Sequence, residues 1–123
     1  MPTLNCLCDE PINLSLLPNP HGFKLIPERS LEPLVDALTA AHAETSSDRD
    51  FSRRAWATLR EPSLSVLQVY ECPSCGRLAV FRHASDAAPI AWYHLDRDAI
   101  GSADTRLSAL LRDGHEAAER GRE

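Results

Sequence analysis

The stretch Cys72-Pro73-Ser74-Cys75-Gly76 decides how this chain folds, because it places two thiols on one tight turn. Two residues between the cysteines bring both sulfurs to the same side of the turn, and the glycine accepts the left-handed backbone conformation that closes it. The proline stiffens the loop before any ligand arrives. Residues 64–70 and 77–82 on either side favour strands. The pattern therefore predicts a knuckle between two strands that supplies half of a metal site.

The other half of the predicted site is the pair in Cys6-Leu7-Cys8, because the 123 residues contain only four cysteines. Four thiolates are the simplest ligand set for one soft cation. The metal ligands predicted from this arithmetic are Cys6, Cys8, Cys72 and Cys75. Such a site would tie the N-terminal residues to the middle of the chain. Asp9 stands where a glycine would complete the first knuckle.

Other interpretations of the cysteines stay open at this point. All four could be free thiols, Cys72 and Cys75 could form a redox pair, and His83 or His94 could replace one sulfur ligand. Redox motifs of this spacing stand at helix N-termini, where the dipole lowers the pKa of the thiol. Residues 77–82 favour a strand instead, which argues against the redox interpretation.

The remaining pattern predicts short strands and inserted helices. Strands are expected at 13–17, 22–26, 64–70, 77–82 and 90–95, with a turn at 19–22 joining the first two. A helix is expected after the N-cap Ser30, ending near 43–45, and a shorter one at 51–59. The predicted apolar faces of these two helices are Leu31, Leu34, Val35 and Leu38, and Phe51, Ala55, Trp56 and Leu59.

A last amphipathic helix is expected after Ser102 or Asp104, and the charged residues 116–123 are expected to fray. The predicted fold class is α+β: a small antiparallel sheet with a zinc-ribbon-like four-cysteine site, packed by one or two inserted helices and a C-terminal helix. We expect one domain over residues 1–100, followed by a C-terminal helix or partly disordered tail over residues 101–123.

Charge bears on the class of partner. The formal net charge is −5, with an isoelectric point of about 5.5, and four thiolates around a divalent ion would add roughly −2. This balance disfavours general binding to phosphate backbones and favours a basic protein partner. The sequence shows no basic and apolar leader and no apolar run long enough to cross a membrane. A reducing cytoplasm is expected, where paired cysteines more often hold metal than form disulfides.

The segment 71–78 resembles the knuckle of zinc ribbons and rubredoxin-like modules. A CxC pair near the N-terminus, followed much later by CPxCGRL, is similar to small bacterial zinc-ribbon proteins. The likeness covers Cys6–Cys8 and residues 71–78 closely and residues 22–27 loosely. It implies that Cys6, Cys8, Cys72 and Cys75 bind a structural zinc ion, and it implies no enzymatic activity.

No catalytic set accompanies the cysteines. The five histidines are scattered, no nucleophile elbow surrounds a serine, and no glycine-rich phosphate loop is present. We expect a non-catalytic protein-binding module, in the form of an immunity- or antitoxin-like inhibitor of a basic toxin or effector, or of an adaptor. The alternative is a nucleic-acid-binding zinc ribbon in transcription that uses Arg53, Arg54, Arg60, Arg77 and Arg82. A thiol oxidoreductase or metal sensor is a third hypothesis.

Overall fold

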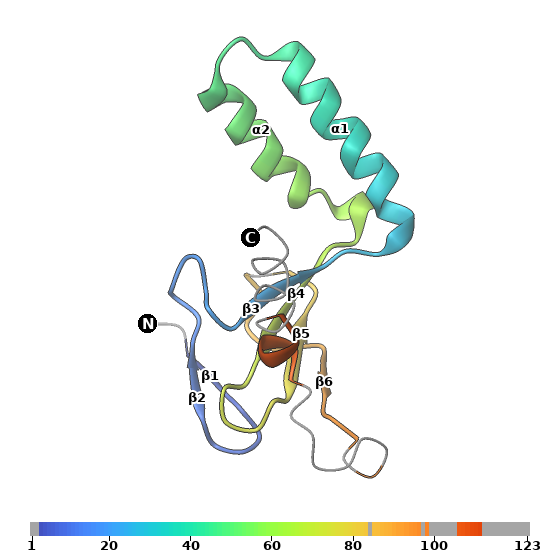
Figure 1. The fold of residues 1–123 in the computed structure, drawn as a ribbon. Coiled ribbons are helices and arrows are strands. Elements are labelled where there is room, and N and C mark those ends of the chain that lie inside the picture. The colour runs from blue at the N-terminus through green and yellow to red at the C-terminus, as the bar shows by residue number, and fades with distance from the viewer. Residues whose placement is uncertain (1–2, 84, 97, 99–105, 112–123) are drawn as a thin grey trace, which may run out of the picture. The chain divides into compact units, whose positions relative to one another are not determined.

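The computed structural model describes residues 3–83, 85–96, 98 and 106–111 (Figure 1). It confirms the predicted α+β class. The strands are β1 (Thr3–Asn5), β2 (Pro11–Asn13), β3 (Gly22–Leu25), β4 (Leu67–Glu71), β5 (Leu78–Phe81) and β6 (Ala91–Tyr93). The helices are α1 (Leu31–Glu44) and α2 (Asp48–Leu59), with the 3₁₀ turns η1 (Glu28–Ser30) and η2 (Pro62–Leu64). None of the described helices combines the length and apolar composition that crossing a bilayer requires.

The N-terminal hairpin differs from the prediction. β1 pairs antiparallel with β2, Leu4 opposite Ile12, and this hairpin was not predicted. The first cysteine pair lies in its turn, whereas the predicted hairpin joined residues 13–17 to residues 22–26. The predicted strand at 13–17 is wrong beyond its first residue. The Asn13 side chain accepts hydrogen bonds from the Ser15 backbone N–H, at 2.9 Å, and from the Ser15 hydroxyl, at 2.6 Å. These local bonds compete with ladder formation and turn the chain out of the strand.

The larger sheet has the order β3-β4-β5-β6. Its last three strands correspond to the predicted strands at 64–70, 77–82 and 90–95 and are neighbours in chain order, with the second cysteine pair in the turn between β4 and β5. β5 pairs antiparallel with β6. β4 begins later than the predicted strand at 64–70 because the η2 turn occupies its start and Ser65 has a left-handed φ of 55°.

The chain divides into two compact units by the contacts between its residues. The strand unit comprises residues 1–23, 69–80 and 89–123 and contains both cysteine pairs. The helical unit comprises residues 24–68 and 81–88 and contains α1 and α2. The expected single domain over residues 1–100 stays a prediction.

Within the helical unit, α1 and α2 form an antiparallel pair (Figure 1). α1 buries Leu34 and Ala41 completely or nearly so, and the His42 and Phe51 rings meet edge to face at 5.6 Å. The predicted α1 face is wrong in part, because Leu31 and Val35 are 47% and 59% exposed. One partner helix covers only one stripe of side chains.

The observed ends of α1 and α2 differ in detail from the predicted ones. α2 begins at Asp48, earlier than expected, because the Ser47 hydroxyl accepts a hydrogen bond from the Asp50 N–H and caps the helix. Ser30 precedes α1 as predicted but makes no side-chain cap bond. Its buried hydroxyl donates instead to the Leu64 carbonyl, which fixes the η2 turn against the start of α1. Trp56 of α2, expected on the packed face, is 61% exposed.

Part of the C-terminal prediction can be compared with the structure. Residues 107–111 are helical, and Ala109 among them is buried. The predicted start of this helix at Ser102 or Asp104 and the expected frayed end at 116–123 lie outside the described residues.

Candidate metal centre

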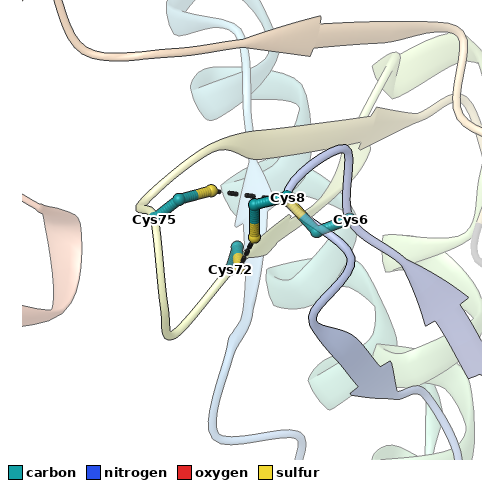
Figure 2. A group of neighbouring side chains, drawn as sticks. All are labelled: Cys6, Cys8, Cys72 and Cys75. Atoms are coloured by element: carbon teal, nitrogen blue, oxygen red, sulfur yellow. Dashed lines mark hydrogen bonds between the residues drawn. The ribbon is translucent and has the colours of Figure 1, made fainter.

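The four cysteine side chains of the strand unit point toward one another (Figure 2). The Cys6 and Cys75 sulfurs are 3.4 Å apart, the Cys8 and Cys72 sulfurs are 3.6 Å apart, and all four lie within 4.8 Å of one another. Four sulfurs at about 2.3 Å from a tetrahedral ion would be roughly 3.8 Å apart. The sulfurs are thus already spaced for one metal ion. Among the described residues, the metal-competent cluster includes neither His83 nor His94.

The two cysteine turns close in the same way. In the second turn, the Cys72 N–H donates to the Arg77 carbonyl at 2.8 Å and the Gly76 N–H donates to the Cys72 carbonyl at 3.0 Å. In the first turn, the Cys6 N–H donates to the Glu10 carbonyl and the Asp9 N–H donates to the Cys6 carbonyl, both at 2.9 Å. The CxC loop is therefore a knuckle with one residue fewer, and each knuckle presents two sulfurs to the centre.

Asp9 occupies the position in the first knuckle that Gly76 occupies in the second. Both backbones are left-handed, with φ of 75° at Asp9 and 78° at Gly76. A side chain at positive φ costs free energy that glycine avoids, although aspartate tolerates the region better than most residues. The sequence marked Asp9 as a departure from a glycine knuckle, and the structure shows that the backbone keeps the glycine conformation.

We expect Asp9→Gly to stabilise the protein by about 0.5–1 kcal/mol, because the left-handed strain is relieved at an exposed position. Chemical denaturation of the metal-loaded protein measures this. The matched change Gly76→Ala should destabilise it, since a Cβ there would lie 2.9 Å from the Arg106 Cγ at positive φ. If Asp9→Gly is destabilising, the equivalence of the two knuckles is wrong.

Apolar packing holds the cysteines in place. Cys6, Cys72 and Ile12 are at most 3% exposed and form one cluster, against which Leu4 and Trp92 pack. Tyr93, next along β6, is 59% exposed. These adjacent aromatic side chains therefore face opposite sides of the strand. Cys8 is exposed and Cys75 half-buried, so the cluster has one face open to solvent.

The thiols differ in acidity. Burial raises the pKa of Cys6 to about 12 and also raises the pKa of Cys72. At Cys75 burial acts in the same direction, but the Arg77 backbone N–H, the Cys6 thiol and the Arg77 side chain outweigh it and lower the pKa to about 6. The Arg77 Nη1 is 3.3 Å from the Cys75 sulfur, and this hydrogen bond raises the pKa of the guanidinium. A cation therefore offsets the charge that thiolate ligands bring.

Glu71 is a buried residue beside the second knuckle that was not predicted from the sequence. Its side chain is only 4% exposed, and its carboxylate accepts hydrogen bonds from the N–H groups of Leu107, at 2.7 Å, and Ser108, at 3.2 Å. Arg106 donates from Nη1 to the Pro73 carbonyl at 3.0 Å. The helical turn at 107–111 is therefore fixed to the second knuckle. The sequence feature that could have indicated this role is the position of Glu71, a carboxylate that directly precedes Cys72 at the end of a buried strand.

Replacing Glu71 by glutamine should cost about 1–2 kcal/mol, because a neutral amide oxygen replaces a carboxylate that binds two backbone donors. Amide hydrogen exchange should then accelerate at Leu107 and Ser108. Glu32→Gln on the exposed side of α1 is the control and should change neither quantity. Unaltered protection at Leu107 in the Glu71 variant would show that this cap contributes nothing.

The arginines of the proposed basic patch lie in different surroundings. Arg54 pairs with Glu44 at 2.6 Å, and Arg53 lies 4.0 Å from Asp50. Arg77 contacts the Cys75 sulfur, whereas Arg60 and Arg82 both line one cavity of the helical unit.

Comparisons with known proteins give a family but no annotated relative. No curated protein and no solved structure matches the chain. Residues 2–97 match the family model described as "Domain of unknown function (DUF8617)", a range that includes all four cysteines. The chain therefore belongs to this family.

Proposed function

We propose that this chain is a non-catalytic protein-binding module whose strand unit is stabilised by a structural zinc ion. The observation that carries the proposal is the convergence of four sulfurs within 4.8 Å. Two concrete forms follow from size, charge and resemblance: an immunity- or antitoxin-like inhibitor of a basic toxin or effector, and an adaptor. A reducing cytoplasm, where thiols stay available to metal, is part of the proposal.

Zinc is the ion that this donor set favours. Four thiolates in a tetrahedral arrangement are the ligands of structural zinc sites, and they fill the coordination shell. A filled shell leaves no position at which water could be activated, so the ion would contribute to folding rather than to chemistry. The Arg77 contact with Cys75 supports this assignment because it offsets the excess negative charge of four thiolates.

The helical unit offers an apolar surface for a partner. Leu31 and Val35 are one turn apart on α1, and both are about half exposed or more. Glu28, Glu32 and Asp36 lie beside them in the sequence and are exposed. An apolar stripe with an acidic border is complementary to a basic partner with an apolar centre, in agreement with the net charge of −5.

The nucleic-acid alternative has less support. Arg53 and Arg54 of α2 already have carboxylate neighbours. Arg77 forms a hydrogen bond with the Cys75 sulfur in the cysteine cluster. A continuous basic track is what non-specific binding to a phosphate backbone requires. The geometry thus favours the protein-binding proposal.

Affinity purification of the full chain, expressed at its native level, tests the proposal. We expect a protein partner with wild type that is lost with Val35→Asp, because a carboxylate enters the apolar stripe. Ser52→Asp, an equal change of charge at an exposed position of α2, should retain the partner. Recovery of the chain alone, or equal recovery of the partner with both variants, would contradict the proposed surface.

A further inference from the structure

A second site lies in the helical unit. A cavity of about 280 Å³ is bordered by the end of α2, by the turn at Ser65, by the start of β4 and by the residues that follow β5. Its lining contains none of the four cysteines and neither Leu31 nor Val35. The cavity therefore shares no residue with the cysteine cluster or with the apolar stripe on α1.

The charge around this cavity is unusual for an acidic protein. Lys24, Arg60 and Arg82 line it, together with His83 and a single carboxylate, Glu61. Among the residues that the structure describes, none of the three cations forms an ion pair with a carboxylate. On α2, by contrast, Arg53 and Arg54 both have acidic neighbours. The chain thus leaves its cations unpaired at this cavity although acidic residues outnumber basic ones, 18 to 13.

Two of these cations are close enough to repel one another. The pKa of Lys24 is lowered, first by partial burial of its ammonium group and then by the positive charge of Arg60. Lys24, Arg60 and Arg82 remain exposed where they border the cavity, and an anion bound between like charges relieves their repulsion. This arrangement is typical of a binding site for an anion.

We propose that this cavity binds a small phosphorylated organic molecule. Guanidinium groups bind phosphate oxygens through two parallel hydrogen bonds, and two arginines and one lysine are present. Three cations and one carboxylate leave a net charge of about +2, which complements a phosphomonoester dianion better than a single carboxylate. Leu59 and Val66 supply an apolar wall for the organic part of the ligand.

Size favours a small ligand over a polymer. The volume is just below the range of about 300–1,000 Å³ that is usual for small-molecule sites. A nucleic acid would need further unpaired cations in line with the cavity, and the next arginines of α2 have carboxylate neighbours. The shared chemistry with a nucleic acid is the phosphate, so the experiment must separate the two.

Titration of the zinc-loaded full chain, followed by NMR at low salt, tests this inference. Adenosine 5′-monophosphate should shift the backbone amide signals of residues 65–68, and inorganic phosphate should shift the same signals at higher concentration. Adenosine should have no effect. Arg82→Gln should weaken binding of the monophosphate by about tenfold or more, because a charge-assisted hydrogen-bond donor is lost. Arg53→Gln, on α2 and outside the cavity, is the matched control.

Several results would overturn the inference. They are equal binding of adenosine and its monophosphate, an absence of shifts with both phosphate probes, and equal weakening by Arg53→Gln. Much tighter binding of an oligothymidylate that also depends on Arg60 and Arg82 would indicate a nucleic-acid groove instead. Lys24→Gln is a second test should Arg82→Gln fold poorly, and it should also weaken the binding of the monophosphate. The outcome does not depend on whether the protein has a protein partner.

Discussion

Serine in place of Cys72 should abolish stoichiometric zinc binding and unfold the N-terminal hairpin. Cys72 is fully buried, its sulfur lies 3.6 Å from that of Cys8, and it belongs to the core cluster with Cys6. β1 and β2 have three residues each, too few for an independent hairpin to be stable in water. Structural zinc sites contribute about 10–16 kcal/mol to the folding of small metal-dependent domains. We expect a loss on the order of 5 kcal/mol or more from this one substitution.

Metal analysis and amide hydrogen exchange check this prediction. The zinc content should fall from one ion per chain to nearly none, and exchange should accelerate most at the amides of β1 and β2. Ser74→Ala changes an exposed residue of the same knuckle and should leave both quantities as in wild type. A Cys72→Ser protein with full zinc content and a protected hairpin would show that this sulfur is not a ligand.

The second large effect is expected at Ile12. Its side chain is 1% exposed and packs in the cluster that contains the Cys6 and Cys72 side chains. Truncation of a buried isoleucine to alanine typically costs 2–5 kcal/mol, and we expect about 3 kcal/mol for Ile12→Ala. The proposed structural zinc ion would couple folding of the strand unit to metal binding, so we expect zinc affinity to fall as well.

Chemical denaturation in the presence of zinc measures the first effect, and competition with a chromogenic chelator measures the second. Ile90→Ala removes the same atoms from a side chain that is 53% exposed, and it should cost less than about 1 kcal/mol. If the Ile12 and Ile90 variants are equally stable and bind zinc equally well, apolar packing does not hold the metal centre together.

The cysteine cluster was predictable from the number and spacing of the cysteines. A four-ligand metal site requires both pairs, whatever structure lies between them, so residues 6–8 and 72–75 were expected to lie close together. The hairpin around the first pair was not predictable in the same way. Leu14, Leu16 and Leu17 continue an apolar pattern that favours a strand, but the Asn13 side chain turns the chain there. Leu17 is 93% exposed, so apolar character did not imply burial.

The helices show a similar limit. Periodicity indicates which residues share a face, and in α1 two overlapping stripes, one with Leu31 and Val35 and one with Leu34 and Ala41, fit the same pattern. Only the position of α2 decides which stripe is buried, and the sequence contains no local signal for it. Glu71 was missed for a related reason, because its partners are backbone N–H groups 36 and 37 residues away.

X-ray absorption at the zinc edge, on protein purified with its native metal, determines whether the four cysteines share one zinc ion. We expect one zinc ion per chain with four sulfur neighbours at about 2.3 Å and no nitrogen or oxygen ligand. A shell with fewer than four sulfurs, or a protein whose cysteines are linked as disulfides and that holds no metal, would contradict this expectation.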